Sequence, residues 1–427
     1  MATPSLAAGP SSEDWPTYLH DTARSGNSPV EPALPSSGIR SLHELWTYDT
    51  ASPVASSATV VGGTVFVGSW NGYEYALNAS TGAVEWKTFL GLKSSPGCGG
   101  GTIGVSSAAT VENGTVYVGG GNATFYALAE QTGAIEWQLV LGSSSSAVYL
   151  WASPLVYRGM VYIGTASQCT DPFVLAKLLL VNATSGSVVR TFLTNPKGIT
   201  GASIWGSPTL DPKNNSVFFA TGSGGTLKET VFVLNASTLK LEGRWSIPFA
   251  QRVPDGDFGN TPTLLTDSRG DRWIEVANKN GIAYAFNETN ISSGPVWEDH
   301  IAVGGPDPTN GQGSISPGTF MGGVLYLGGG HTVINGLHCS GSVRAVDPWT
   351  GAYLWQYCAP GVVLGGLASV NGMIVVAAGH TLVILNASTG LRVWHEKLDD
   401  ALWASPSVAE GKIFESTTEG TVYALGE

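Results

Sequence analysis

Two acidic residues separated by a single glycine are the strongest candidates for chemistry in this chain. Asp255 and Asp257 lie in the segment VPDGDFGNTPTL, directly before a short apolar run. Carboxylates this close shift each other's ionisation, which suits acid–base work. The same pattern also fits an ordinary turn in which an aspartate caps the next strand. Both interpretations remain open from the residues alone.

A lysine and three tryptophans are the other candidates. Lys279 stands in VANKNGIAYAF, where a cation can polarise a carbonyl group or hold an anionic ligand, or can simply be a solvated lysine in a turn. Trp151, Trp205 and Trp403 each precede a short apolar run. These side chains can act together only if the fold brings them to one place.

An internal repeat supplies the elements that would position them. The segments VFVGSWNGYEYALNASTGAVEW and VYVGGGNATFYALAEQTGAIEW end at Trp86 and Trp137. Each contains two apolar strands and a polar turn that closes on Thr-Gly, with a tryptophan four residues after that glycine. Further copies end at Trp245, Trp297, Trp355 and Trp394, and one copy has Arg190 in the tryptophan position.

A further short strand precedes each copy, and eight equivalent starts are found at Ala58, Ala108, Pro154, Pro208, Pro262, Pro317, Ala368 and Pro406. Periods of roughly 40 to 50 residues with four strands each are typical of propeller blades. The eighth copy stops after its third strand, and SLHELWTYD around Trp46 can supply the fourth. We therefore predict an all-β, eight-bladed β-propeller of four-stranded antiparallel blades, with its ring closed by the N-terminal strand.

The predicted domain organisation is simple. Residues 41–427 form the propeller and residues 1–40 form an N-terminal extension. Function in such a fold is expected on loops at one mouth of the central channel. We expect the candidate side chains to converge there, namely Trp151, Trp205, Asp255, Asp257, Lys279 and Trp403.

Composition excludes some partners. Charged residues make up 12% of the chain and its formal net charge is −12, so it lacks the basic stripe that nucleic acid binding requires. No apolar run is long enough for a transmembrane segment. Because so few carboxylates can be protonated, tolerance of low pH is a hypothesis.

Cysteines and glycosylation motifs favour export. The opening MATPSLAAGPSSEDW has no signal-peptide character, so either the chain is cytosolic or a signal peptide has been removed. Four cysteines without CxxC spacing suggest two disulfides, for which Cys339–Cys358 and Cys98–Cys169 are preferred. Cys339 could instead ligate a metal with His331 and His338.

Nine N-x-S/T motifs could carry glycans, at Asn78, Asn113, Asn122, Asn182, Asn214, Asn235, Asn287, Asn290 and Asn386. Asparagine also suits tight turns, so these motifs have a second explanation. Together the cysteines and these motifs predict an extracellular, periplasmic or cell-surface glycoprotein.

The repeat resembles the tryptophan-docking motif of the quinoprotein alcohol dehydrogenase-like superfamily, approximately A-x-D-x-x-T-G-x-x-x-W. Ala76 to Trp86 follows this pattern with Asn78 in the aspartate position, and the resemblance runs from about Trp15 onward. It implies a propeller and, for the dehydrogenases of the superfamily, the cofactor pyrroloquinoline quinone (PQQ) with Ca²⁺.

The resemblance also implies roles for the candidates. Asp255 and Asp257 match a segment in which an aspartate acts as general base or metal ligand. Lys279 matches the cation that contacts the quinone carbonyls, and Trp205 fits the floor beneath the quinone. Ser223 stands where a calcium-binding asparagine belongs, and a hydroxyl is a weaker calcium ligand than an amide oxygen.

Other features of the superfamily are missing from the sequence. No glutamate ligand is found near Gln168 and Asp171, and the adjacent-cysteine disulfide over the quinone is absent because Cys98 stands alone. The catalytic pattern is therefore present while the calcium ligand set is incomplete. Trp151 and Trp403 are expected to frame the cofactor position.

Three functions follow from this pattern. The first is a PQQ-dependent dehydrogenase of an alcohol or sugar that passes electrons to a separate acceptor, since no haem motif is encoded. The second is a non-catalytic extracellular binding or scaffold module with a cell-envelope protein as partner. The third is a cofactor-free hydrolase of the tetrathionate hydrolase type.

Overall fold

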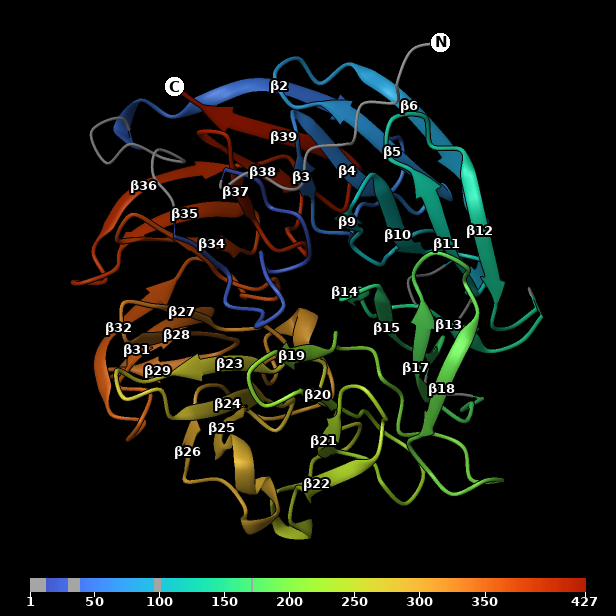
Figure 1. The fold of residues 1–427 in the computed structure, drawn as a ribbon. Coiled ribbons are helices and arrows are strands. Elements are labelled where there is room, and N and C mark those ends of the chain that lie inside the picture. Colours follow the sequence, from blue (N-terminus) through green and yellow to red (C-terminus); the bar gives the residue numbers. More distant parts are fainter. Residues whose placement is uncertain (1–12, 30–38, 96–100, 144, 170–171) are drawn as a thin grey trace.

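The computed structural model describes residues 13–29, 39–95, 101–143, 145–169 and 172–427. These residues form eight four-stranded antiparallel sheets that surround a central axis as the blades of a propeller (Figure 1). The fold class predicted from the repeat is confirmed. Each blade runs outward in chain order, so its first strand lines the channel and its last strand faces solvent.

The first four blades cover the chain up to residue 246. Their strands are β3 (Thr59–Val61), β4 (Thr64–Gly68), β5 (Tyr73–Asn78) and β6 (Val84–Phe89); β9 (Thr110–Glu112), β10 (Thr115–Gly119), β11 (Thr124–Ala129) and β12 (Ile135–Val140); β14 (Leu155–Tyr157), β15 (Met160–Gly164), β17 (Lys177–Asn182) and β18 (Val188–Leu193); and β19 (Thr209–Asp211), β20 (Ser216–Ala220), β21 (Thr230–Asn235) and β22 (Leu241–Ser246).

The last four blades complete the ring. Their strands are β23 (Thr263–Thr266), β24 (Arg272–Ala277), β25 (Ile282–Asn287) and β26 (Trp297–His300); β27 (Thr319–Met321), β28 (Val324–Gly329), β31 (Gly341–Val346) and β32 (Tyr353–Ala359); β33 (Ala368–Val370), β34 (Met373–Ala378), β35 (Thr381–Asn386) and β36 (Arg392–Lys397); and β37 (Ser407–Ala409), β38 (Lys412–Ser416), β39 (Thr421–Gly426) and β2 (His43–Asp49).

The eighth blade joins the two ends of the propeller. Strand β2 pairs antiparallel with β39, and Trp46 lies opposite Ala424. This is the closure predicted from the truncated eighth copy. It completes the eighth blade and pairs β39, whose edge would otherwise be open. The seventh blade gains a fifth strand because β1 (Asn27–Ser28) pairs parallel with β33.

Neighbouring blades dock through the Thr-Gly turn and the tryptophan. The indole of Trp86 donates a hydrogen bond to the carbonyl of Glu130 in the next blade at 2.7 Å. Gly133 of that blade has φ of 67°, and a Cβ added there would lie 2.5 Å from the Trp86 ring. The position must therefore be glycine both for its backbone conformation and for the close approach of the ring.

Hydroxyl groups link the blades at the channel wall. The backbone N–H of Ser153 donates to Oγ of Ser207, and that of Ser207 donates to Oγ1 of Thr261, each at 2.9 Å. The N–H of Ser405 likewise donates to Oγ of Ser57 at 2.8 Å. This contact explains why a serine or threonine precedes the proline at so many strand starts.

One end of the channel is closed by residues 13–28. Their backbone pairs with residues in or beside the innermost strands of seven blades, at Val60, Val111, Leu210, Leu264, Phe320, Ser369 and Glu410. The remaining blade is reached by the fully buried Arg24, which donates to the carbonyls of Pro154 and Pro208 at 3.0 Å. The segment thus contacts every blade. The division of domains at residue 40 stays a prediction.

Asparagine turns account for several of the glycosylation motifs. The side chains of Asn78, Asn182, Asn235, Asn287 and Asn386 each accept hydrogen bonds from the turn that follows them. Asparagine therefore has a structural role at these positions, where the repeat otherwise has aspartate. Glycosylation itself stays a prediction.

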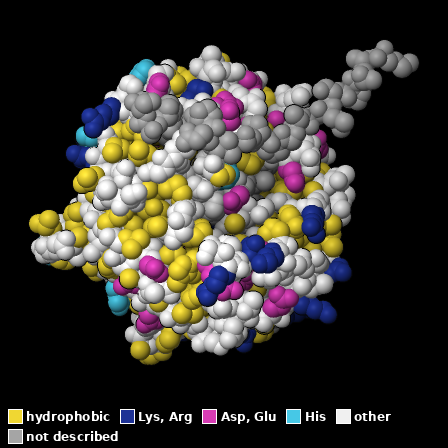
Figure 2. All heavy atoms as spheres, turned by 60° about the vertical axis from the view of Figure 1, so that its left-hand side comes forward, with side chains coloured by type: hydrophobic (Ala, Val, Ile, Leu, Met, Phe, Trp, Pro, Cys, Tyr) yellow, Lys and Arg dark blue, Asp and Glu magenta, His cyan; other side chains and the backbone are white. Residues whose placement is uncertain are grey.

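The cysteines and the surface agree with the sequence in part. Cys339 and Cys358 form a disulfide, as predicted, which excludes Cys339 as a metal ligand. Cys98 lies outside the described residues, so its pairing with Cys169 stays a prediction. Figure 2 shows charged side chains thinly scattered among apolar and uncharged ones on the face it presents. No helix in the described ranges is long and apolar enough to cross a bilayer.

Candidate site at the open channel mouth

The loops at the unsealed end of the channel enclose a cavity of about 220 Å³. These loops precede the innermost strands or join the second and third strands of a blade. The cavity is lined by Trp151, Ser167, Gln168, Cys169, Phe173, Ser203, Trp205, Ser223, Asp255, Asp257 and Lys279. Six of the seven residues predicted from sequence as site residues or as the frame of the mouth therefore meet in one cavity, and Trp403 is the exception.

Asp255, Asp257, Lys279 and Ser223 form a closed polar cluster. Nζ of Lys279 donates to Oδ2 of Asp255 at 3.0 Å and to Oδ2 of Asp257 at 2.7 Å. Oγ of Ser223 lies 2.8 Å from Oδ1 of Asp255 and 2.5 Å from Oδ1 of Asp257, so its single proton is shared between the two carboxylates. The two blades involved are the fourth, which carries Ser223 after β20, and the fifth, which carries the others around β23 and β24.

Burial gives this cluster its electrostatic character. The side chains of Lys279 and Asp257 are 8% and 10% exposed, whereas that of Asp255 is 29% exposed. Burial raises the pKa of Asp257, and although Lys279 opposes this, the nearby Asp255 helps to keep that pKa above its usual value. Burial lowers the pKa of Lys279, but its attraction to Asp257 and Asp255 outweighs burial and raises that pKa overall.

Trp205 forms the floor of the cavity. Nζ of Lys279 lies 5.5 Å from the centroid of the Trp205 ring. A Cβ on Gly259 would lie 2.1 Å from this ring, and one on Gly222 would lie 3.0 Å from its Nε1. The two glycines therefore leave the space in which the indole lies. Trp205 also lines a second cavity of about 140 Å³ inside the channel, so its ring separates the mouth from the interior.

The other two tryptophans lie at different depths. Trp151 lines both cavities, as Trp205 does. Trp403 lines only the inner cavity, where its ring packs 6.0 Å from that of Trp70. The structure thus places Trp151 with the acidic cluster and Trp403 on the far side of the tryptophan floor.

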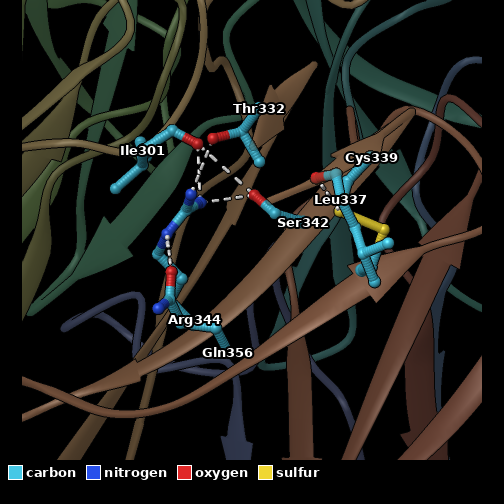
Figure 3. The surroundings of a disulfide bond; sticks show 8 residues. Ile301, Thr332, Leu337, Cys339, Ser342, Arg344 and Gln356 are labelled. Carbon is cyan, nitrogen blue, oxygen red and sulfur yellow. Dashed lines mark hydrogen bonds between the residues drawn. A yellow bond between two sulfur atoms is a disulfide. The ribbon is translucent and has the colours of Figure 1, made fainter. Parts of the chain in front are cut away.

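A disulfide-bonded hairpin supports the backbone of Lys279. Strands β29 (Thr332–Ile334) and β30 (Leu337–Cys339) form this hairpin beside the Cys339–Cys358 bond. Figure 3 shows Arg344 between the hairpin and the neighbouring loop, donating to Thr332 at 2.9 Å and to the carbonyl of Ile301 at 2.6 Å. Beyond Ile301, the N–H of Gly305 donates to the carbonyl of Lys279 at 2.9 Å.

Several lining residues gave no signal in the sequence. Phe173, Ser203 and Ser167 carry no motif, and only the fold brings them beside Trp205. Glu229 is 2% exposed and lines an outer cavity of about 520 Å³ with Asp255 and Ser223. Burial raises the pKa of Glu229, although Arg252 and Lys228 oppose it. Asp171 lies outside the described residues.

The oxygen ligands suit a calcium ion poorly. Among the described residues, no group of three or more His, Cys, Asp or Glu side chains could hold a metal ion. The cluster offers two carboxylates and one hydroxyl, whereas Ca²⁺ takes six to eight oxygen ligands. An aromatic floor beside a cation is, by contrast, a fitting surface for a planar quinone.

Comparison with known proteins supports the resemblance seen in the repeat. The family model described as "Outer membrane protein assembly factor BamB" matches residues 40–262 and 340–427. A polyvinylalcohol dehydrogenase of Pseudomonas sp. is 26% identical over 341 residues, which are 69% of this chain and 50% of that protein. The chain spans about half the length of the polyvinylalcohol dehydrogenases that it matches.

Two further likenesses bear on the alternatives. A tetrathionate hydrolase of Acidithiobacillus ferrooxidans is 23% identical over 286 residues, covering 66% of this chain and 51% of that protein. The solved structure of a europium-containing methanol dehydrogenase has a TM-score of 0.78 at 15% identity and covers 98% of both chains. At that identity the structural likeness shows the fold alone.

Proposed function

The chain belongs to the family of PQQ-like propellers whose model is described as outer membrane protein assembly factor BamB, and from this premise we propose that its open mouth is the active site of a quinone-dependent dehydrogenase. The substrate is a neutral alcohol or sugar, and the protein acts outside the cytoplasm. The observation that carries this proposal is the buried Asp255–Lys279–Asp257 cluster over the Trp205 ring.

The charge of the cavity points to a neutral substrate. Its described lining includes two carboxylates, Asp255 and Asp257, against one ammonium, Lys279. Because Lys279 is already paired with both carboxylates, an anionic substrate such as that of a tetrathionate hydrolase would meet the exposed edge of Asp255 and not a free cation. Hydroxyl compounds can instead donate hydrogen bonds to the exposed edge of Asp255 and accept one from Ser167, whose oxygen accepts from Ser203.

The site residues have separate roles in the proposed reaction. Trp205 would stack beneath a quinone, and Lys279 would donate to its carbonyl oxygens; when bound, the quinone would supply the acceptor for the hydride, which carries both electrons of the oxidation. Asp255 and Asp257 take the hydroxyl proton of the substrate as a coupled pair, because Lys279 and Ser223 bridge both carboxylates. The raised pKa of Asp257 brings the pair closer to the working pH of a general base.

One further observation supports the setting. The Cys339–Cys358 disulfide favours an oxidising compartment. A redox dye can stand in for the electron acceptor in an assay.

A binding or scaffold role is the alternative, and exposed apolar side chains on the same face favour it. Phe249 is 89% exposed, and Leu337, Val303 and Val333 are each more than half exposed. All four lie in the connections between blade strands at the open end, two of them in the β29–β30 hairpin, where a cell-envelope protein could dock. The converging charges of the Asp–Lys cluster are not needed for such a role, which is why we place the enzymatic function first.

The test is a titration of the whole protein with PQQ. Binding raises the melting temperature by mass action, and dye-linked oxidation is then measured on neutral alcohols and sugars. Asp255→Asn and Asp257→Asn are expected to lower the rate by at least about 100-fold, because a general base supplies this much. Lys213→Met, an exposed lysine of the fourth blade, is the control for Lys279→Met. No thermal shift and no oxidation at high micromolar PQQ would instead favour the binding role.

A further inference from the structure

We propose that the ammonium of Lys279 is the resident cation of this site and takes the place of a divalent metal ion, so that the site needs no metal. This inference rests on the proposed function for its biological meaning, but its geometry stands separately. Nζ of Lys279 lies between the two carboxylates, 3.0 Å from Asp255 and 2.7 Å from Asp257. That is the position from which a metal ion would bind both.

All four carboxylate oxygens of the pair already accept a hydrogen bond. The Oδ2 atoms accept from Lys279, and the two Oδ1 atoms share the single hydroxyl proton of Ser223. The backbone N–H of Ser223 also donates to Oδ1 of Asp257. A metal ion would have to displace both donors before it could use these oxygens as ligands, and Ser223 offers only one neutral hydroxyl in return.

The lysine is also held by its backbone. Its N–H donates to the carbonyl of Asp257 at 3.0 Å, and its carbonyl accepts from Gly305 at 2.9 Å. Gly313 packs so closely that a Cβ there would lie 2.3 Å from the Lys279 carbonyl oxygen. If the side chain left the cluster, two largely buried carboxylates would lose their cation, which is strongly unfavourable.

The same geometry makes the lysine and a metal ion mutually exclusive. A divalent ion beside an unmoved ammonium would be repelled at short range in a partly buried site. Without the ammonium, the two carboxylates, Ser223 and entering water would provide an oxygen-rich site. Removal of Lys279 should therefore create a metal site that the natural protein lacks.

Terbium luminescence and calcium calorimetry on the whole protein test this, since Trp205 lies close enough to sensitise a bound lanthanide. After treatment with EDTA, the natural protein is expected to bind neither ion at micromolar concentration, and Ca²⁺ or EDTA should leave its melting temperature unchanged. Lys279→Met is expected to bind one ion at least tenfold more tightly, with a lower melting temperature that Ca²⁺ restores. The double variant Lys279→Met with Asp257→Asn should lose this binding, and Lys213→Met should behave as the natural protein.

Binding of one ion by the natural protein, with a melting temperature lowered by EDTA, would overturn the proposal. Absence of metal binding in both Lys279→Met and Lys279→Asn would also overturn it, because the ammonium would then not be what excludes the metal. Lys279→Asn is the second variant because its amide adds an oxygen ligand if the methionine variant folds poorly.

The outcome separates this inference from the proposed function. Quinone-dependent oxidation that persists in EDTA supports both. Oxidation that requires Ca²⁺ overturns the inference and leaves the dehydrogenase standing. No oxidation, together with no metal binding by the natural protein and a gained site in the variant, refutes the dehydrogenase and leaves the inference standing.

Discussion

The two ends of the channel differ in how they use buried charge. At the sealed end, Arg24 has no carboxylate within salt-bridge distance among the described residues and donates instead to carbonyls of the third and fourth blades and to Tyr18 and Thr17 of its own segment. At the open end, Lys279 contacts two carboxylates and faces a cavity. Arg24 fastens a segment that touches every blade, whereas Lys279 serves two loops of neighbouring blades. Contacts shared by all blades thus stabilise the ring, and departures from the repeat supply chemistry.

The largest effect on stability is expected from Arg24→Met. Burial lowers the pKa of this guanidinium to about 10, although Tyr18 and Asp21 oppose this, so it remains charged at neutral pH. Its removal leaves the carbonyls of Tyr18, Pro154 and Pro208 without their donor, which costs about 1–3 kcal/mol for each buried group and about 5 kcal/mol in all. Chemical denaturation measures the loss.

The exposed Arg190→Met is the control for this change and should alter stability by less than about 0.5 kcal/mol. Quinone-linked activity per folded molecule should be unchanged by Arg24→Met, because the segment lies at the opposite end from the acidic cluster. A variant that keeps its stability but loses activity would contradict the division between the two ends.

The sequence predicted the architecture of the ring better than the composition of the mouth, because the ring is built from contacts that repeat and the mouth from residues that depart from the repeat. The Trp86 position and its Thr-Gly turn recur, so a single sequence reveals their period, and the closure by Trp46 follows from counting strands. Asp255, Asp257 and Lys279 were found as departures just before or after predicted strands. Phe173 and Glu229 were missed because they lie in irregular loops whose path depends on contacts between blades. Trp403 was expected at the mouth but lines the inner cavity, because the order of strands does not reveal how deep a side chain lies in the channel.

The next largest effect concerns the pH dependence of stability and a buried carboxyl that, unlike those at the mouth, has no cation beside it. Glu275 is fully buried, and neither of its oxygens has a hydrogen-bond partner within the described residues. Burial raises its pKa from 4.5 to about 8. Since the folded pKa is the higher one, the neutral acid favours the folded state fully below pH 4.5, and this contribution is lost as the pH rises toward 8.

Glu275→Gln should therefore flatten the pH dependence of stability between pH 4.5 and 8, by on the order of 3 kcal/mol at the upper end. Thermal unfolding across this range measures it. The exposed Glu242→Gln serves as the control. A natural protein that is equally stable at pH 4.5 and 8, with no change in the variant, would show that this carboxyl finds a partner and would weaken the hypothesis of acid tolerance.

Removal of the disulfide is expected to have a smaller effect on stability, but it should also alter the loop that holds Lys279 at the mouth. Cys339→Ser with Cys358→Ser opens a loop of 19 residues and should lower stability by about 2–3 kcal/mol. The loosened hairpin no longer braces Arg344 and Ile301, so the loop that holds the carbonyl of Lys279 gains freedom. We expect the KM for the quinone or substrate to rise several-fold with a smaller change in kcat.

Reduction of the natural protein by dithiothreitol should reproduce the change in KM, which separates the loss of the bond from the effect of the new serines. If stability falls while KM stays constant, the hairpin supports only its own blade, and the path from the disulfide to Lys279 carries no functional coupling.

The smallest effect is expected at a turn of the repeat that joins β35 and β36, the two outermost strands of the seventh blade. Oδ1 of Asn386 accepts hydrogen bonds from the N–H groups of Ser388 and Thr389 at 3.1 and 3.0 Å. Asn386→Ala removes this acceptor and should cost about 1 kcal/mol, whereas Asn386→Asp retains it and should stay within about 0.5 kcal/mol at pH 7. Thermal unfolding of protein from a host that adds no glycans measures both. Equal losses in the two variants would mean that the amide nitrogen, and not the acceptor oxygen, stabilises the turn, and asparagine would then be preferred for a reason that the copy with Asp347 does not share.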